Sequence, residues 1–589
     1  MASTRVLNQA GGTLGLTFFL LMGCNSLVGL DKIHVTDQPT ESAGSANGGQ
    51  SNAEGGTAGK GGGVEQGGTG ARPHGEGGEG GEAPQGDCTT NQECTDRSSE
   101  EAIDAGAAIG TVVPAACVKT PSAHCVKLLS EDCDGITGDY TDDRAIFLGS
   151  LFSTKGPTAD TNLSRQQSAA LAIEQINAVG GVPDGSTSAH PRPLVMVSCD
   201  ESTNLVRAAT HLVSDLHVPA IVGPNTSQDT IDVSTKVTVP GGTVVMSPTG
   251  VASSIAALSD NDLTWLMVPS DVQRAPLMIN QIGVLETQIK DTLPGSPQRP
   301  IKLGVVFRND ALGIGTRTAL NDLTLNEVSL TKNLTNGHVR IDPYNGADAN
   351  QKPIIDNYLN FLPDMIVLAG TAEAITQVMV PLEDQWPEDV ARPQYILIDS
   401  TKVKELLTAV TNKDDLRHRI RGTGITSITP SSAGTDTAET NDTPAATYDA
   451  FQVDYGVRYP GANATLSGMG PAHDAAYAIA LALAATASEE VSGASVARGL
   501  RKLAGGETKL TATGTNVLPA FQKLAAGEKI SAVGTFGMLD WDKNGAVLGG
   551  TLEMWCIGGP STKPAYGSSG RFYEIKSQAY SGTYIQCGP

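Results

Sequence analysis

The chain has 589 residues, a formal net charge of -23 and an aromatic content of 4%. It is too long for one ordinary domain and long enough for several buried cores. An acidic chain without a basic cluster is a poor candidate for binding nucleic acid, and the low aromatic content argues against a stacking surface for single strands.

Residues 1–24 have the pattern of an export signal. Arg5 supplies a positive charge, and Leu14–Met22 is mostly apolar but too short to span a bilayer in the mature protein. The segment ends Leu-Met-Gly-Cys at Cys24, which resembles a bacterial lipobox, where the signal is cut before a cysteine that carries lipid. The alternative is an ordinary signal peptide with a chance cysteine. We expect lipidation at Cys24 and an exported protein, periplasmic or on the cell surface, anchored to a bacterial membrane.

Residues 25–86 are rich in glycine and poor in large apolar side chains, as in the run SAGSANGGQSNAEGG. Such a segment cannot bury enough surface to offset its chain entropy. We therefore predict a disordered tether between the lipid anchor and the folded part.

Residues 87–143 form a small cysteine-rich segment. Apart from Cys24 the chain has eight cysteines, and an even number in an exported protein favours disulfides. A metal site is the competing interpretation, but no C-x2-C pair and no histidine at ligand spacing supports it. The segment holds an odd number of cysteines, so one of them should pair outside it.

The predicted pairs follow partly from parity. We expect Cys556 to pair with Cys587 and Cys133 to pair with Cys199, because Cys199 ends a strand beside the strand that begins near Ala145. The four remaining cysteines would then pair among themselves, with connectivity left open: Cys88, Cys94, Cys117 and Cys125.

From Ala145 onward, predicted strands and helices alternate. AIFLGSLF, PLVMVSC, AIVG and TVVMS read as strands separated by helical segments, and a second series begins at IKLGVVF and includes MIVLAG and QYILIDS. Alternation of this kind predicts parallel sheets with helices on their faces. The end of the chain is glycine-rich and strand-like.

Two neighbouring strand ends in the first series carry hydroxyl groups. The run Ala220–Val222 stops at Gly223-Pro224 and is followed by Thr226 and Ser227 at a helix N-terminus, while a second run is broken at Ser247. Open backbone N–H groups and hydroxyls at such strand ends favour a small ligand with an anionic group. The alternative is that Ser227 and Ser247 only cap helices.

Nine segments, in order, carry a resemblance to the leucine/isoleucine/valine-binding proteins of the type I periplasmic binding protein family. They span about residues 144–556: AIFLGSLFSTKGPTADTNLSRQQSAALAIEQINAVGGV, PAIVGPNTS, VVMSPTG, VPSDVQRAP, FRNDALGIG, PDMIVLAGT, QYILIDS, HDAAYAIALAL and GMLDWDKNG. The resemblance implies an α/β fold of two doubly wound parallel-sheet lobes joined by three crossovers, with the ligand in the cleft between them. Lobe 1 would comprise residues 144–268 and 431–530, and lobe 2 residues 269–430 and 531–589 with the tail.

The resemblance also implies ligand-binding residues. Ser227 falls on the serine that holds the ligand carboxylate, with Thr226 beside it, and Thr249 with Gly250 falls on a backbone contact. Asp399 falls on the acidic residue that pairs with the ligand ammonium, for which a carboxylate has suitable chemistry. The alternative for Asp399 is a helix N-cap or strand-end carboxylate.

Other positions depart from the family pattern. Val251 stands where a hydroxyl threonine is common, and Leu312 stands where tyrosine is common. Thr371 or Ala372 replaces an aromatic that covers the ligand, and Thr161 replaces an aromatic at the rim of the first lobe. The side-chain pocket is therefore rebuilt, and we expect a ligand other than leucine, isoleucine or valine.

No catalytic signature is present. H-E-x-x-H, G-x-S-x-G and G-x-x-x-x-G-K-[ST] are absent, so no enzyme activity and no cofactor are expected. Asp540–Gly545 resembles the start of a calcium loop, but Thr551 stands where that loop needs glutamate, and a hairpin turn at Asn544-Gly545 explains it better.

The expected function is that of a lipid-anchored solute-binding protein of an ABC importer. It would capture a small molecule, an amino acid or related compound, and deliver it to permease subunits. The alternative is a ligand-sensing or surface-recognition module with the same fold and no role in transport.

Overall fold

The computed structural model describes most of the chain, and its described residues belong to one compact unit, Gly81–Pro589. The predicted lipid site at Cys24 and the predicted tether lie outside them. No helix within the described ranges is long and apolar enough to cross a membrane. The described ranges are 87–156, 159–185, 190–292, 299–346, 348, 350–428 and 443–588.

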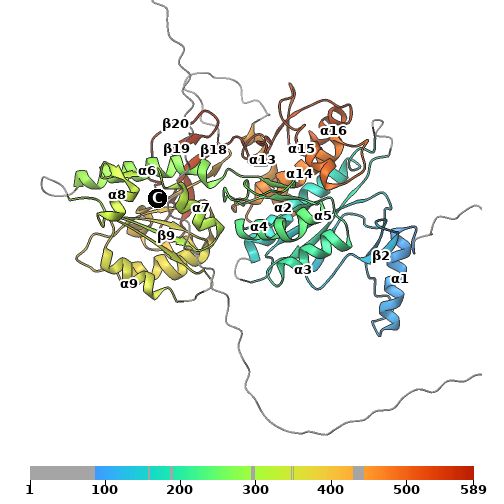
Figure 1. The fold of residues 1–589 in the computed structure, drawn as a ribbon, viewed down its shortest axis with the longest axis horizontal. Helices are drawn as coiled ribbons and strands as arrows, with labels where there is room; N and C mark the ends of the chain where they lie inside the picture. The colour runs from blue at the N-terminus through green and yellow to red at the C-terminus, as the bar shows by residue number, and fades with distance from the viewer. Residues whose placement is uncertain are drawn as a thin grey trace, which may run out of the picture. The chain divides into compact units, whose positions relative to one another are not determined.

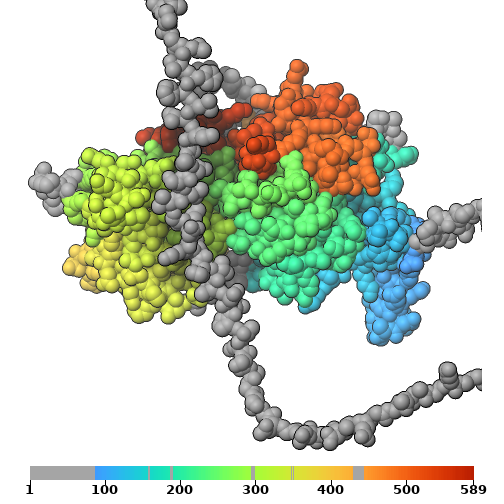
Figure 2. All heavy atoms as spheres, viewed as in Figure 1, coloured from blue at the N-terminus to red at the C-terminus, as the bar shows by residue number. Residues whose placement is uncertain are grey.

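The cysteine-rich segment folds as a helix, α1 (Asn91–Asp104), against an antiparallel pair, β1 (Ala115–Val118) and β2 (His124–Lys127). Thr90 caps the helix by accepting a hydrogen bond from the Glu93 N–H. The segment is drawn in blue beside the first lobe in Figure 2. The Asn91 N–H donates to Asp143 Oδ1 at 2.6 Å, which holds the start of α1 close to the first lobe.

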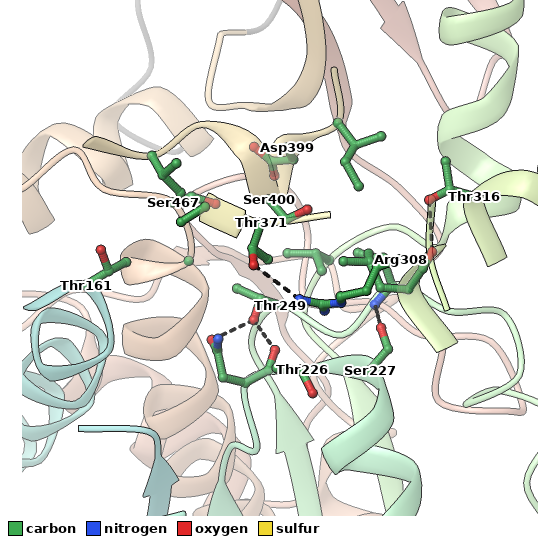
Figure 3. Close-up of a pocket in the computed structure, with 18 of the residues that line it drawn as sticks. Thr161, Thr226, Ser227, Thr249, Arg308, Thr316, Thr371, Asp399, Ser400 and Ser467 are labelled. Atoms are coloured by element: carbon green, nitrogen blue, oxygen red, sulfur yellow. Dashed lines mark hydrogen bonds between the residues drawn. The ribbon is translucent and has the colours of Figure 1, made fainter. Parts of the chain in front are cut away.

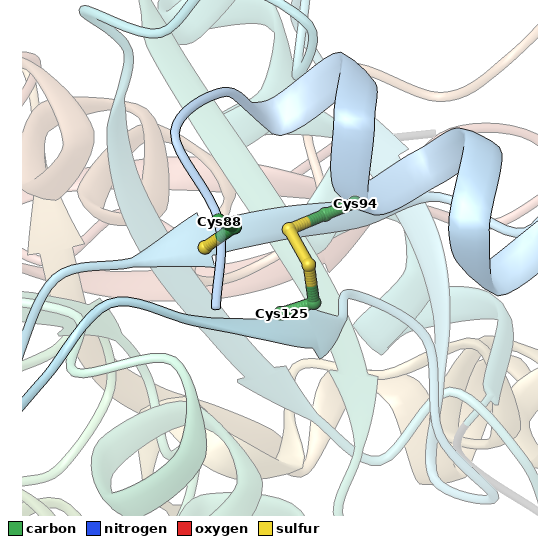
Figure 4. Close-up of side chains that lie close together, drawn as sticks. All are labelled: Cys88, Cys94 and Cys125. Atoms are coloured by element: carbon green, nitrogen blue, oxygen red, sulfur yellow. A yellow bond between two sulfur atoms is a disulfide. The ribbon is translucent and has the colours of Figure 1, made fainter. Parts of the chain in front are cut away.

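Both disulfides that the sequence named are confirmed, and so is the pairing of the other four cysteines among themselves. Cys133 pairs with Cys199 and Cys556 with Cys587, with Cα separations of 3.9 and 5.6 Å. The four cysteines of the small segment pair among themselves as Cys88–Cys117 and Cys94–Cys125. The sulfur atoms of Cys88, Cys94 and Cys125 lie within 4.8 Å of one another (Figure 4), but each belongs to a disulfide and offers no thiolate to a metal.

The first lobe is built on a six-stranded sheet with the order β3-β5-β4-β6-β7-β8. Strand β3 is antiparallel to β5, and the other neighbours are parallel, so the sheet is doubly wound from β4 outward. The strands are β3 (Cys133–Thr137), β4 (Ile146–Phe152), β5 (Leu194–Asp200), β6 (Ala220–Val222), β7 (Val244–Ser247) and β8 (Thr264–Leu266).

Helices cover both faces of this sheet (Figure 1). Along β5, Leu194 and Met196 pack into one buried cluster and Val197 and Cys199 into another, because successive side chains point to opposite faces. One face carries α2 (Ala159–Ala178), α13 (Pro444–Arg458), α14 (Met469–Ala485), α15 (Gly493–Leu500), α16 (Val517–Ala525) and the pair β16 (Lys509–Thr511) and β17 (Ser531–Val533). The other face carries α3 (Leu205–Thr210), α4 (Ser227–Val233), α5 (Val239–Gly241) and π-helical turns at His211–Asp215 and Ser234–Thr238.

The second lobe is built on an eight-stranded sheet with the order β12-β9-β13-β14-β15-β18-β19-β20. The first five strands are parallel, and the last three continue the sheet in antiparallel pairing. The strands are β9 (Leu303–Arg308), β12 (Val339–Tyr344), β13 (Met365–Ala369), β14 (Gln394–Leu397), β15 (Ile420–Thr426), β18 (Thr551–Gly558), β19 (Ala565–Glu574) and β20 (Ala579–Ser581).

Helices again divide between the two faces. On one face, a cluster of buried apolar side chains joins the sheet to α6 (Asp271–Thr292), α7 (Ala311–Ala319) and α8 (Leu330–Thr335). The small hairpin β10 (Thr324–Leu325) and β11 (Val328–Ser329) lies on the same face. The second cluster packs the opposite face under α9 (Lys352–Phe361), a π-helical turn at Ala374–Met379, α10 (Val380–Asp384), α11 (Lys404–Val410) and α12 (Asp414–His418). Each lobe therefore has its own core on both sides of its sheet.

The chain crosses into the second lobe for the last time at a later residue than 531, where the sequence placed the boundary. Trp541 and Val547 belong to the core of the first lobe, and the Trp541 Nε1–H donates to the Leu266 carbonyl at 2.7 Å. The second sheet is rejoined only at Thr551, where β18 begins. The strand-like appearance of this stretch hid the boundary, because the turn at Gly545, which has a φ of +74°, closes a small hairpin on the first lobe.

Candidate ligand-binding site

A cavity of about 740 Å³ is lined by segments from both lobes. Its walls are built by the loops that follow parallel strands of the two sheets, together with α6, α7, α11 and the turn before α14. Binding sites in open α/β sheets form at these carboxyl ends of strands. Figure 3 shows Thr226, Ser227 and Thr249 on one side of the cavity and Asp399 on the other.

Nearly all the predicted ligand-binding residues line this cavity, although they come from distant parts of the chain. Gly250 does not line it, because its N–H is turned away and donates to Ser247 Oγ at 3.1 Å. The residues on the wall are Thr161, Thr226, Ser227, Thr249, Val251, Leu312, Thr371 and Asp399.

Ser227 and Thr226 have different local roles. Thr226 is the N-cap of α4, and its Oγ1 accepts from the Asp229 N–H at 3.1 Å, so the capping alternative applies to this residue. Ser227 Oγ accepts from the N–H groups of Val251 (3.0 Å) and Ala252 (3.2 Å) and thereby ties two loops together. Its own hydroxyl hydrogen has no acceptor among the described residues and remains able to donate.

The Thr249 hydroxyl is already committed to the protein. It donates to Asn225, with Oδ1 at 2.7 Å and the backbone carbonyl also in contact. The Thr249 N–H makes no hydrogen bond within the described part of the chain. Ser247, in contrast, is fully buried and bonds to the Pro224 carbonyl at 2.9 Å.

Asp399 faces the cavity from the start of a 3₁₀ turn that follows β14. Its side chain does not cap that turn. Instead its Oδ2 lies 3.3 Å from Nη1 of Arg274, a buried residue of α6. The family resemblance gave no indication of Arg274 as a partner. A ligand ammonium would share the Asp399 carboxylate with Arg274.

Thr371 belongs to a second charged group on the same lobe. Arg308 Nη1 contacts Thr371 Oγ1 at 3.1 Å (Figure 3) and Glu373 Oε1 at 3.3 Å. Arg308 Nε also lies 2.6 Å from Asp310 Oδ2. This arginine lines the cavity with its charge already balanced by two carboxylates.

Arg165, on α2, is a third arginine of the cavity wall and was missed from the sequence. It donates to the Ser467 carbonyl (2.7 Å), Asn162 Oδ1 (2.8 Å) and Asn225 Oδ1 (2.7 Å). A signal was present, since Arg165 lies four residues before Ala169 on the apolar stripe that faces the core. A charged residue on such a stripe indicates a buried polar site.

Aliphatic side chains form another part of the cavity wall. Leu312 of α7 and Met278 of α6 line it together with Val251, Ile398 and Ile425. No aromatic side chain is among its lining residues in the described ranges. Leu312, Thr371 and Thr161, the positions where the family pattern is not kept, all lie on this wall.

Glu201 lies behind the wall, where Ser153 donates to its Oε1 at 3.0 Å. It is 5% exposed, and burial raises the pKa of this carboxyl well above its ordinary value, with a further contribution from the charge of Asp229.

No model of a known protein family matches the chain, and no curated protein matches it in sequence. Solved structures do match. A branched-chain amino acid transporter substrate binding protein from Streptococcus pneumoniae, in complex with isoleucine, is 16% identical, with a TM-score of 0.50 over 72% of this chain and 99% of that one. A leucine binding protein from Thermotoga maritima is 11% identical, with a TM-score of 0.49 over 72% of this chain and 97% of its own.

The similarity covers almost the whole of the Streptococcus pneumoniae protein and 72% of this chain, a share long enough to include both lobes. Two doubly wound lobes, with a cavity at the carboxyl ends of the strands of both, complete the correspondence. The chain therefore has the two-lobed fold of the type I periplasmic binding proteins.

Proposed function

We propose that the chain is an extracytoplasmic solute-binding lipoprotein that captures a small molecule between its lobes for an ABC importer. The observation that carries this proposal is the cavity of about 740 Å³, whose wall comes from strand ends of both sheets. A volume of this size suits a small-molecule ligand, and a wall divided between two bodies suits capture by closure.

The ligand in this proposal is an amino acid or a related compound. Ser227 and the Thr249 N–H would hold its carboxylate, and Asp399 would attract an ammonium group. The solved Streptococcus pneumoniae protein with this fold is described as bound to isoleucine, which supports a ligand of this kind. The lack of an aromatic cover in the described lining supports a side chain other than that of leucine, isoleucine or valine.

Export and anchoring complete the proposal. Lipid at Cys24 and a tether over residues 25–86 would hold the binding part near a membrane, where permease subunits could receive the ligand. Residues 144–268 with 443–550, and 269–428 with 551–588, would be the two bodies that close on it.

A thermal-shift screen of the purified chain against amino acids, their amides and small carboxylates tests the proposal. A ligand that binds only the native state raises the melting temperature, and the rise grows with the logarithm of its concentration above Kd. Small-angle scattering should then show a smaller radius of gyration with the bound compound, and mass spectrometry should recover that compound unchanged. Chemical turnover of the compound, or no shift with any member of the panel, would contradict the proposal.

A further inference from the structure

Arg165 differs from the other arginines of the cavity in the chemistry of its partners. Its three hydrogen bonds, of 2.7 to 2.8 Å, all reach neutral oxygens. No carboxylate of the described residues forms a salt bridge with it, whereas Arg274 and Arg308 are each bonded to at least one.

This arginine is also buried, with 9% of its surface exposed. Burial lowers the pKa of Arg165 to about 10, opposed by the charges of Asp399 and Glu201, so the guanidinium stays protonated at neutral pH. Keeping a charge away from water without an ionic partner is unfavourable. An anion entering the cavity would supply that partner.

The position of Arg165 places it beside the predicted carboxylate site. Its Nη1 and the Thr249 hydroxyl both bond to Asn225 Oδ1, each at 2.7 Å. A Cβ on Gly468 would meet both the Thr249 side chain, at 2.4 Å, and Arg165 Nε, at 2.7 Å, so the two groups lie against the same turn. Arg165 and the Thr249 N–H therefore belong to one donor-rich end of the cavity.

The negative charge of Asp399 is less available to a ligand than the positive charge of Arg165. Asp399 has Arg274 as a counter-ion at 3.3 Å, so its carboxylate does not depend on a ligand ammonium for compensation. The second lobe also contributes aliphatic side chains to the wall, among them Met278, Leu312 and Ile425.

We propose that Arg165 binds the carboxylate of the ligand, and that the site takes an organic anion with an aliphatic body whose α-amino group is dispensable. This inference rests on the proposed solute-binding function and narrows its ligand class. A planar guanidinium matches a carboxylate with two parallel hydrogen bonds, which makes Arg165 the residue that selects for that group.

Four matched series of straight-chain compounds, of four to ten carbons, test the ligand class on the wild-type chain. They are alkanoates, 2-aminoalkanoates, alkanamides and alkylamines, titrated by calorimetry at equal chain length. We expect alkanoates and 2-aminoalkanoates to bind within about tenfold of each other. Alkanamides and alkylamines should bind at least about tenfold more weakly, the usual cost of losing a charged hydrogen bond.

Variants test the assignment of Arg165. Arg165→Gln should weaken the best alkanoate by about 10- to 100-fold, and Arg165→Lys, which keeps the charge, should recover part of the loss. Arg458→Gln is the matched control, because Arg458 pairs with Glu174 on an exposed surface of the first lobe, with 50% of its side chain exposed, and does not line the cavity. Near-ultraviolet circular dichroism and the melting temperature without ligand would check that each variant is folded.

The outcomes separate this inference from the proposed function. Binding by 2-aminoalkanoates alone, equal binding by amides, or an unchanged affinity in Arg165→Gln would overturn the inference while leaving a solute-binding protein. No binding by any of the four series would also overturn it, and the proposed function would then be decided by the wider thermal-shift screen.

Discussion

The carboxylate of Asp399 lies 3.3 Å from the guanidinium of Arg274, although the two residues are 125 positions apart in the chain. Both side chains are shielded, with 13% and 10% of their surfaces exposed. The pair forms part of the cavity wall. Asp399 is therefore a structural counter-ion as well as a candidate ligand group.

We expect Asp399→Asn to lower the free energy of unfolding by about 3 kcal/mol, because it leaves the buried Arg274 charge without its partner. Urea denaturation measures this. Asp160→Asn is the control, since Asp160 is an exposed residue of the cavity rim, and it should change stability by less than about 0.5 kcal/mol. If the Arg274→Gln/Asp399→Asn double variant loses as much as the sum of the two single variants, the pair is not coupled.

Gly468 offers a test of the cavity that changes no charge. It has a φ of +84°, and an added Cβ would fall 2.4 Å from Thr249 Cγ2 and 2.7 Å from Arg165 Nε. Gly468→Ala should therefore weaken ligand binding by about tenfold, the effect of overpacking a tight site. Gly461→Ala is the matched control, because Gly461 has a φ of +83° with nothing within 4 Å of its Cβ position. Equal effects on binding in calorimetry would show that backbone strain alone is responsible.

The Cys133–Cys199 disulfide closes a loop with a sequence separation of 66 residues and joins β3 to β5. Replacing both cysteines by serine should lower the free energy of unfolding by about 4 kcal/mol, from the greater entropy of the unfolded chain. Guanidinium denaturation under non-reducing conditions measures the change. A loss below about 1 kcal/mol would mean that the ladder between β3 and β5 holds this edge without the covalent link.

Glu383 gives the second lobe a dependence on pH. Burial by itself would raise the pKa of Glu383, but hydrogen bonds and charge from Arg419, helped by Tyr395 and Arg392, lower it below its ordinary value of 4.5. The ionised carboxylate therefore contributes stability above pH 4.5, and that contribution is lost as the pH falls through the folded-state value.

We expect Glu383→Gln to lower the free energy of unfolding by about 3 kcal/mol at pH 7 and to flatten its decline below pH 4.5. Urea denaturation from pH 3 to pH 7 would show both effects. Asp415→Asn is the control, because Asp415 also contacts Arg419, at 3.0 Å, but is 77% exposed. That variant should cost at most about 1 kcal/mol. Parallel pH profiles for wild type and Glu383→Gln would remove Glu383 from the acid response.

Lipidation at Cys24 stays a prediction from the sequence. Cys24→Ala should release the exported chain from membranes, because the altered Leu-Met-Gly-Ala sequence has no thiol to carry the lipid. Fractionation of cells that express the wild type and the variant measures the partition. Wild-type chain found in the soluble fraction, or the variant retained on membranes, would contradict the assignment.

The sequence was sufficient for the fold because the relevant information is local. Alternating apolar runs and helical segments predicted two parallel sheets, and the strand end before Ser227 pointed to the cavity that this residue lines. The antiparallel extension β18–β20 and the late return at Thr551 were not resolved in the same way, since their pattern is set by what each strand pairs with.

The charges of the site were much harder to predict. Arg274 and Asp399 are 125 residues apart, and Arg165 and Ser467 are 302 apart, so no spacing in the sequence connects them. The resemblance supplied Asp399 as a ligand group and said nothing of the arginine beside it. Which arginines are balanced and which one is left with neutral partners depends on the packing of two lobes.

The disulfides of the N-terminal segment also determine which parts of the molecule would carry a force applied to the N-terminal chain. Tension on the chain that enters at Asp87 would meet Cys88–Cys117 and Cys94–Cys125 first, and then Cys133–Cys199 at the edge strand of the first sheet. No disulfide in the described residues connects this route to the second sheet, whose own bond, Cys556–Cys587, lies within that lobe. Force from a membrane anchor would therefore be applied to the first lobe only. The second lobe could move relative to the first without stretching the tether.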